Sequence, residues 1–183
     1  MDALEELVSE ILWLEGYSVQ TSVKIELTKE ENRLIGRRSS PRWELDIVAY
    51  HGRENLLRVV ECKSYFDSAG VKASSFDGTS PDDAERFRLF NETELRRIVF
   101  NRLCLQLAAS GACREMPQVR LSLACGKVRN EDRAAIRAHF ERQGWEIWDE
   151  SWLRKRLEHM ARQGYEDQVS AVVAKLFSRG KVE

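Results

Sequence analysis

The sequence lacks the features that mark membrane, secreted or zinc-binding proteins. None of its apolar runs is long enough to span a bilayer, and its acidic, amphipathic start is unlike a secretory signal. Cys62, Cys104, Cys113 and Cys125 are scattered and lack the Cys-x-x-Cys spacing of zinc sites. We therefore expect a cytoplasmic protein with reduced thiols, without zinc and without a membrane partner.

An excess of positive charge is also missing, because the 183 residues carry a net charge of −1. The basic residues nevertheless gather in two polar segments, which hold Arg33, Arg37, Arg38 and Arg42, and Arg86, Arg88, Arg96, Arg97 and Arg102, respectively. Local arginine patches bind a phosphate backbone even when the total charge is near zero. We expect Arg37, Arg38, Arg42 and Arg102 to contact nucleic acid. The alternative is an ordinary solvated surface on which the arginines are balanced by Glu30, Glu31, Glu85, Glu92 and Glu94.

Three ionisable residues stand on two neighbouring apolar runs. Asp46 lies in the run 43–50, while Glu61 and Lys63 end the run 56–63. Buried strands seldom keep ionisable side chains without partners. Residues 50–55 are typical of a turn, so the two runs predict an antiparallel hairpin. Because side chains alternate along a strand, Glu61 and Lys63 should share one face, with Cys62 on the other and Asp46 close to Glu61.

Two neighbouring carboxylates repel each other unless a positive charge lies between them. Mg²⁺ prefers oxygen ligands and keeps several waters, so Asp46 and Glu61 are suited to bind it, and we expect Mn²⁺ to substitute. Lys63 would orient or deprotonate an attacking water, or offset charge on the transition state. The pattern predicts a metal site that cuts phosphodiester bonds. The alternative is a surface hairpin whose charges merely pair.

This arrangement resembles the PD-(D/E)xK nuclease superfamily, which includes restriction endonucleases, Holliday-junction resolvases and Mrr-like enzymes. The matching residues run from the first helix to Lys63 and, more loosely, through the helix that contains Gln106. The proline that names the motif does not precede Asp46 directly, since Pro41 lies five residues earlier. The resemblance implies that Asp46, Glu61 and the backbone carbonyl of Cys62 bind metal and that Lys63 is catalytic. It also implies a restriction-endonuclease-like three-layer α/β/α core (αβββαβ) around a mixed sheet, followed by extra C-terminal helices.

The first helix carries a further candidate. An apolar stripe predicts a helix over residues 2–15, with Glu5 at the edge of the stripe and Gly16 as a stop. Resolvase-like and Mrr-like members carry a helical glutamate eleven residues before a Gly-aromatic pair, and Glu5 has that separation from Gly16 and Tyr17. The resemblance thus implies that Glu5 is a metal or water ligand. The alternative is a solvated acid that favours the helix dipole.

A glutamine in a later helix completes the set. The spacing of Asn91 and Glu94 predicts the start of a helix. Asn91 would be the N-cap, and the Glu94 side chain would bond back to the N-cap backbone. Gln106 falls on the inward face of this helix, and a buried glutamine needs partners. Some superfamily members use a glutamine here near the metal, while a glutamine bonded to backbone is the alternative.

The remaining segments complete a single domain, 1–183, with its core at about 1–126 and a strand and helices at about 130–180. We expect, in order, a strand over 17–27, a polar loop over 28–41, a long substrate-facing loop over 64–90, a strand over 118–125 parallel to the Lys63 strand, a helix over 131–143, a strand over 145–148, a helix opened by Asp149 and a last helix. The last helix carries an apolar stripe of Val169, Val172, Val173, Leu176 and Phe177. We interpret this stripe as core cover, with a homodimer interface as the alternative.

Together these patterns predict a Mg²⁺-dependent DNA endonuclease. One alternative is a catalytically silent nuclease-fold domain that binds DNA or a partner protein. Another is a structural or regulatory assembly protein that uses its terminal helix.

Overall fold

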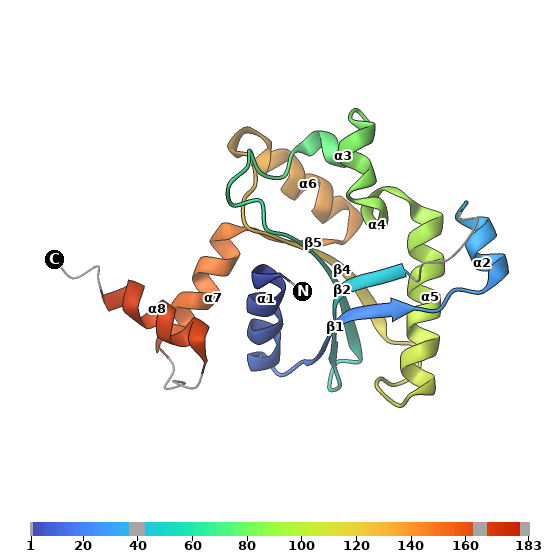
Figure 1. Ribbon diagram of the computed structural model, residues 1–183, viewed down its shortest axis with the longest axis horizontal. Helices are drawn as coiled ribbons and strands as arrows, with labels where there is room; N and C mark the ends of the chain where they lie inside the picture. Colours follow the sequence, from blue (N-terminus) through green and yellow to red (C-terminus); the bar gives the residue numbers. More distant parts are fainter. Residues whose placement is uncertain (1, 37–42, 163–167, 180–183) are drawn as a thin grey trace.

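The computed structural model describes residues 2–36, 43–162 and 168–179 and shows a mixed sheet with helices on both faces (Figure 1). The strands are β1 (Ser18–Ile25), β2 (Trp43–His51), β3 (Leu56–Lys63), β4 (Gln118–Cys125) and β5 (Glu146–Trp148). The α-helices are α1 (Ala3–Leu14), α2 (Lys29–Leu34), α3 (Pro81–Glu85), α4 (Arg88–Asn91), α5 (Thr93–Ala109), α6 (Arg133–Gln143), α7 (Glu150–Arg162) and α8 (Val169–Arg179). Two short 3₁₀ helices are η1 (Ala73–Ser75) and η2 (Asn130–Asp132).

The five strands follow their sequence order across the sheet. β1, β2 and β3 are antiparallel, and the predicted hairpin is confirmed by a register that runs from Ile47 opposite Val60 to His51 opposite Leu56. β4 and β5 are parallel to β3, so the predicted crossover through α5 is also confirmed. The mixed α/β class expected from the sequence is therefore present.

Two apolar clusters cover the two faces of the sheet. The α1 face consists of buried side chains from α1 and α7 packed on the sheet, including Leu4, Val8, Ile11, Ile47, Ala49, Val60, Leu153 and Met160. The α5 face joins α5, α6 and the segment after β3, including Leu57, Val59, Phe76, Leu95, Val99, Leu103, Leu121, Leu123 and Phe140. β3 is buried on both faces, which explains why its sequence is a nearly continuous apolar run.

β1 and β2 change faces at Asp46. Ile47 and Ala49 belong to the α1 face, whereas Leu45 belongs to the α5 face although an alternating strand would keep all three together. Across from Asp46 in the β1–β2 register stands Ser22, whose φ is 52°. The sheet is therefore irregular at the residue that the sequence singled out.

The expected polar loop over residues 28–41 is wrong for its first part, because α2 forms there. Thr28 and Glu31 make a capping box, in which the Thr28 hydroxyl accepts from the Glu31 backbone N–H and the Glu31 carboxylate accepts from the Thr28 N–H. This Thr-x-x-Glu spacing is visible in the sequence and predicts a helix start. Residues 37–42 lie outside the described part of the chain.

The segment over residues 64–90 is not a structureless loop either. It contains η1 and α3 and leads into α4, and Phe76 and Phe90 pack on Phe140 of α6 with ring centroids 5.0 and 5.2 Å apart. Asn91 ends α4 and donates to the carbonyls of Ser75 and Ala84, at 2.8 and 3.0 Å. The predicted Asn91 cap of α5 is therefore wrong.

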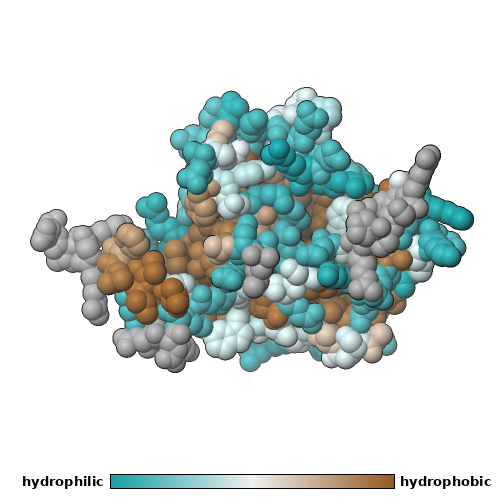
Figure 2. Space-filling model, in the orientation of Figure 1, coloured by the Kyte–Doolittle hydropathy of each residue, from teal (hydrophilic) through white to brown (hydrophobic). Residues whose placement is uncertain are grey.

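The apolar stripe of α8 does not cover the core. Val169, Leu176 and Phe177 are 81%, 68% and 76% exposed, while Ala171 and Ala174 are the buried side chains of this helix. α8 packs against α7, and its apolar side chains form a brown patch in Figure 2. The expectation of core cover is wrong, and a homodimer interface stays a prediction. Within the described ranges, no helix combines the length and apolar character needed to cross a membrane.

Candidate active site

The sheet opens between β2 and β3 at the predicted site. Pairing of β2 with β3 stops at Ile47 and Val60, whereas β3 stays paired with β4 as far as Lys63 opposite Cys125. Continuing the hairpin register by one residue sets Asp46 opposite Glu61. Both carboxylates therefore stand where the two strands part.

Two short contacts organise this opening. The Asp46 Oδ2 atom accepts a hydrogen bond from the backbone N–H of Cys62 at 2.8 Å. In a regular antiparallel ladder that N–H would bond to a carbonyl of the neighbouring strand, so the carboxylate replaces a strand partner. The Lys63 ammonium donates to Glu61 Oε1 at 2.6 Å, with side chains 24% and 18% exposed.

The pKa values at the opening reflect burial first and the charges of neighbouring residues second. Burial raises the pKa of Asp46, and the bond from Cys62 and the charge of Lys63 offset this only in part. Burial also raises the pKa of Glu61, which Lys63 opposes and which Asp46 and Glu5 reinforce. Burial alone would lower the pKa of Lys63, but Glu61 and Asp46 raise it. Lys63 is therefore held in its protonated form.

The structure brings Glu5 to the same place. Burial raises the pKa of Glu5, followed by the negative charges of Asp46 and Asp2. The charge of Asp46 acts on both Glu5 and Glu61, and Glu5 also acts on Glu61, so the three carboxylates are neighbours. Glu5 therefore stays a candidate ligand.

Asp2 is a contributor that the sequence analysis missed. Its carboxylate caps α1 by accepting from the backbone N–H groups of Leu4 and Glu5, at 2.8 and 3.0 Å. Its charge also raises the pKa of Asp46. An aspartate directly before an apolar helical stripe was the available signal.

The donor set suits a hard divalent cation bound by few protein ligands. Glu61 and Asp46 both act on Lys63, while Glu5 acts on Glu61 and Asp2 acts on Asp46. A cation held by Asp46 and Glu61 would relieve this repulsion. The described residues contain no group of three or more His, Cys, Asp or Glu side chains arranged to hold a metal. Mg²⁺ is commonly bound by one or two carboxylates, with water molecules completing its coordination shell.

Cys62 does not offer a thiolate to such an ion. Burial, followed by the charge of Asp46, raises the pKa of its thiol. All four cysteines are free, and Cys62, Cys113 and Cys125 are buried. What Cys62 contributes to the opening is its backbone N–H.

Gln106 is not part of this cluster. Its side-chain oxygen accepts from the Glu26 N–H at 2.8 Å, and its amide nitrogen donates to the Lys24 carbonyl at 3.2 Å. The residue thus ties α5 to the end of β1. The expected catalytic role of Gln106 is unsupported, and backbone bonding, the stated alternative, is what the structure shows.

The second arginine segment is largely neutralised within the chain. Arg102 binds Glu31 through Nη2 at 2.8 Å, Arg88 pairs with Glu92, and Arg97 pairs with Glu94. These pairs match the solvated-surface alternative. The pair of Arg102 with Glu31 also links α5 to α2. Arg37, Arg38 and Arg42 lie outside the described residues.

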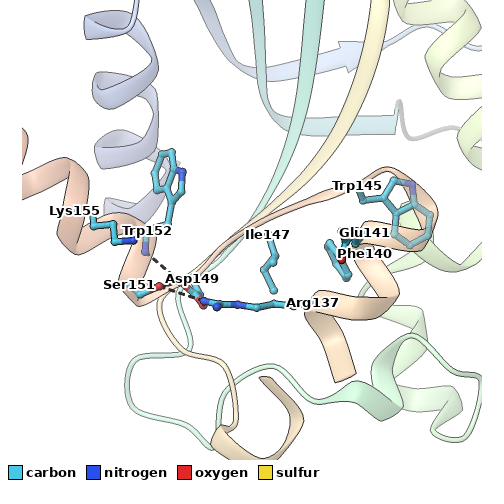
Figure 3. Close-up of a pocket in the computed structure, with 9 residues that line it drawn as sticks. All are labelled: Arg137, Phe140, Glu141, Trp145, Ile147, Asp149, Ser151, Trp152 and Lys155. Atoms are coloured by element: carbon cyan, nitrogen blue, oxygen red, sulfur yellow. Dashed lines mark hydrogen bonds and ion pairs between the residues drawn. The ribbon is translucent and has the colours of Figure 1, made fainter. Parts of the chain in front are cut away.

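A separate pocket of about 410 Å³ lies beside β5, between α6 and α7 (Figure 3). Arg137 reaches across it to the Asp149 carboxylate at 2.6 Å, and Asp149 also accepts from the backbone N–H of Ser151 and Trp152. Burial would raise the pKa of Asp149, but the bonds from Ser151 and Arg137 lower it. Asp149 thus begins α7, as predicted, and its charge is already compensated.

No protein-family model, curated protein or solved structure matches this chain. The resemblance to PD-(D/E)xK nucleases therefore depends on Asp46, Glu61 and Lys63, and on the order of the first helix and the hairpin. Chemically, the opening offers two carboxylates for a cation and one protonated amine for a developing negative charge. That combination is suited to phosphoryl transfer.

Proposed function

We propose that the protein is a divalent-metal-dependent DNA endonuclease with a restriction-endonuclease-like core. The observation that carries this proposal is the excess of carboxylates over Lys63 at the point where β2 and β3 part. Buried charge that is not compensated costs stability, and such groups persist mainly where they serve binding or catalysis.

Asp46 and Glu61 would hold the ion, with Glu5 positioned to orient its waters. A bound Mg²⁺ or Mn²⁺ would supply a Lewis acid that polarises the phosphate and lowers the pKa of a bound water. The Cys62 carbonyl remains a proposed further ligand, as the resemblance implies. The repulsion among the carboxylates falls when such a cation binds.

Of the roles expected for Lys63, its ion pair with Glu61 favours charge stabilisation over proton abstraction. A protonated amine next to the scissile phosphate offsets the charge that develops on its oxygens. Glu61 aims that amine, because its Oε1 accepts the Lys63 bond at 2.6 Å. Asp46 also holds the end of β3 by accepting the hydrogen bond from the Cys62 N–H. The same carboxylate would therefore have a structural role and a metal-binding role.

The element order supports the core that we propose. α1 and the β1–β2–β3 meander are followed by α5 and β4, with α1 and α5 on opposite faces of the sheet (Figure 1). This order corresponds to αβββαβ, interrupted by α2, α3 and α4. β5, α7 and α8 would be additions to it.

A cleavage assay with a matched lysine control tests the function. Purified protein is incubated with supercoiled DNA and Mg²⁺, Mn²⁺ or EDTA, and we expect nicking or cutting only with the cations. Lys63→Gln should lower the rate by about a hundredfold or more because a transition-state contact is lost. Lys72→Gln should cut normally, since Lys72 pairs with Asp83 at 3.5 Å outside the cluster.

Two other results would support the alternative functions instead. DNA binding without cutting, together with no Mg²⁺ signal in calorimetry, would support the silent nuclease-fold domain. Oligomers in light scattering without DNA affinity would support the assembly protein. A parallel RNA substrate shows which nucleic acid is cut.

A further inference from the structure

The pair formed by α7 and α8 leaves an apolar groove open to solvent. A groove of about 580 Å³ lies between the two helices, and its apolar lining includes Leu157 of α7 and Val173, Ala174 and Phe177 of α8. Ala174 is 8% exposed, whereas Val173 and Phe177 are 42% and 76% exposed. α8 therefore buries a small side chain and leaves its larger apolar side chains on the surface.

The exposed apolar surface extends along α8 beyond the groove. Val169, Val172 and Leu176 are 81%, 43% and 68% exposed, and with the groove residues of α8 they recur at helical spacing. They form the continuous brown patch of Figure 2. Single exposed apolar side chains are common, but a contiguous patch of this kind marks a binding surface.

The α7 side of the groove is charged, and its charge is mainly positive. Arg154, Glu158 and Arg162 line it at intervals of four residues, and all three side chains are exposed. Neither arginine has an ion pair within the described part of the chain. In contrast, Arg156 on the same helix pairs with Glu15 at 2.5 Å. The rim of the groove therefore carries positive charge that the described residues do not neutralise.

We propose that this groove binds an amphipathic helix of a partner protein, with acidic side chains flanking its apolar stripe. The inference goes beyond the proposed nuclease function and does not depend on it. A helix that lies in an apolar groove inserts side chains at positions i, i+3, i+4 and i+7. Carboxylates on its flank would then pair with Arg154 and Arg162, and such complementarity selects the partner.

Charge and shape argue against two other occupants. α8 contains Lys175 and Arg179 but no Asp or Glu, so α8 of a second copy would bring positive charge to the positive rim. Like charges facing each other across an interface oppose binding. An anionic bilayer would match the charge, but its surface is flat and would leave the floor of the groove unfilled. A convex acidic helix matches both properties.

Fluorescence anisotropy with two labelled synthetic helices tests the charge argument. Both carry a leucine stripe at helical spacing, which is flanked by glutamates in one and by lysines in the other. The full chain should bind the glutamate helix about tenfold more tightly, and added salt should reduce this preference. Arg154→Glu combined with Arg162→Glu should reverse the preference without lowering the melting temperature, because both side chains are exposed. Arg53→Glu in the exposed hairpin turn is the matched control and should leave the preference unchanged.

The apolar part of the surface is tested separately. Phe177→Asp should abolish binding of the glutamate helix, whereas Met116→Asp, at a side chain that is 91% exposed outside the groove, should not. Equal affinity for both helices, or no binding of the glutamate helix, would overturn the inference. A dimer in light scattering that Phe177→Asp separates would overturn it in favour of a second copy. Binding to phosphatidylglycerol vesicles that Phe177→Asp abolishes, without a preference for the glutamate helix, would overturn it in favour of a membrane surface.

Discussion

The two ends of β3 hold charged side chains in different ways. At the first end, the Arg58 Nε donates to the Tyr17 hydroxyl at 2.9 Å, and its guanidinium pairs with Glu146. Glu146 is also bonded by the Ser122 hydroxyl at 2.9 Å and by Arg120 at 3.3 Å. At the other end, Glu61 shares Lys63 with Asp46, and the negative charge of Glu5 also acts on Glu61.

The difference separates a cluster whose charges are compensated within the chain from the one to which we assign a function. Glu146 has a full set of positive and hydroxyl donors, and Arg58 is stacked near the rings of Tyr17 and Trp148. Around Glu61 the carboxylates raise each other's pKa values instead. A fold gains nothing from such repulsion, and this supports the cation site that we propose at the second cluster.

The comparison predicts its largest effect at Asp46. Asp46→Asn should lower DNA cleavage by about a thousandfold, since a metal ligand is lost. The melting temperature without metal should stay the same or rise, because Asn keeps an acceptor for the Cys62 N–H and removes a buried charge. Cleavage assays and thermal melts measure the two effects. A variant that melts much lower would show that Asp46 is primarily structural.

The opposite result is expected at Arg58. Arg58→Ala should destabilise the fold by about 2 to 3 kcal/mol, because Glu146 keeps its charge without its main partner. The pair is mostly buried, with side chains 17% and 23% exposed. Denaturant unfolding measures the loss, and cleavage per folded molecule should stay unchanged. Arg53→Ala in the exposed hairpin turn is the control and should unfold like the parent. If both arginine variants unfold alike, the Arg58 cluster is not the structural one.

A smaller effect is expected in the pH dependence. The folded-state pKa values of Asp46, Glu61 and Glu5 are raised, so their contribution favours the fold at low pH and is lost as pH rises through those values. The stability of Asp46→Asn relative to the parent should therefore increase between about pH 4 and 7. Saturating Mg²⁺ should reduce this difference, because it stabilises the ionised parent. Melts across this range, with and without Mg²⁺, would contradict the comparison if the gap stayed constant.

Much of the site was predictable because it depends on local rules. A turn between two apolar runs determines the hairpin, and alternation determines which side chains face each other, so Asp46, Glu61 and Lys63 could be placed together in advance. The apolar stripe placed Glu5 at the edge of the buried face of its helix, and the resemblance assigned it to the site. Gln106 could not be placed, because its helix axis relative to the sheet depends on packing between distant elements.

The sequence alone determined the strands, most helices and the charges at the end of β3, since periodicity and turn residues act over a few positions. Tertiary structure decided that Asp46 lies where the sheet changes face, that Gly126 packs against the Ser64 carbonyl, and that α8 packs through its alanines rather than its larger apolar side chains. These outcomes depend on contacts between segments far apart in the chain. Close packing in the assembled core decides which of these contacts are sterically allowed, and no local sequence pattern reports it.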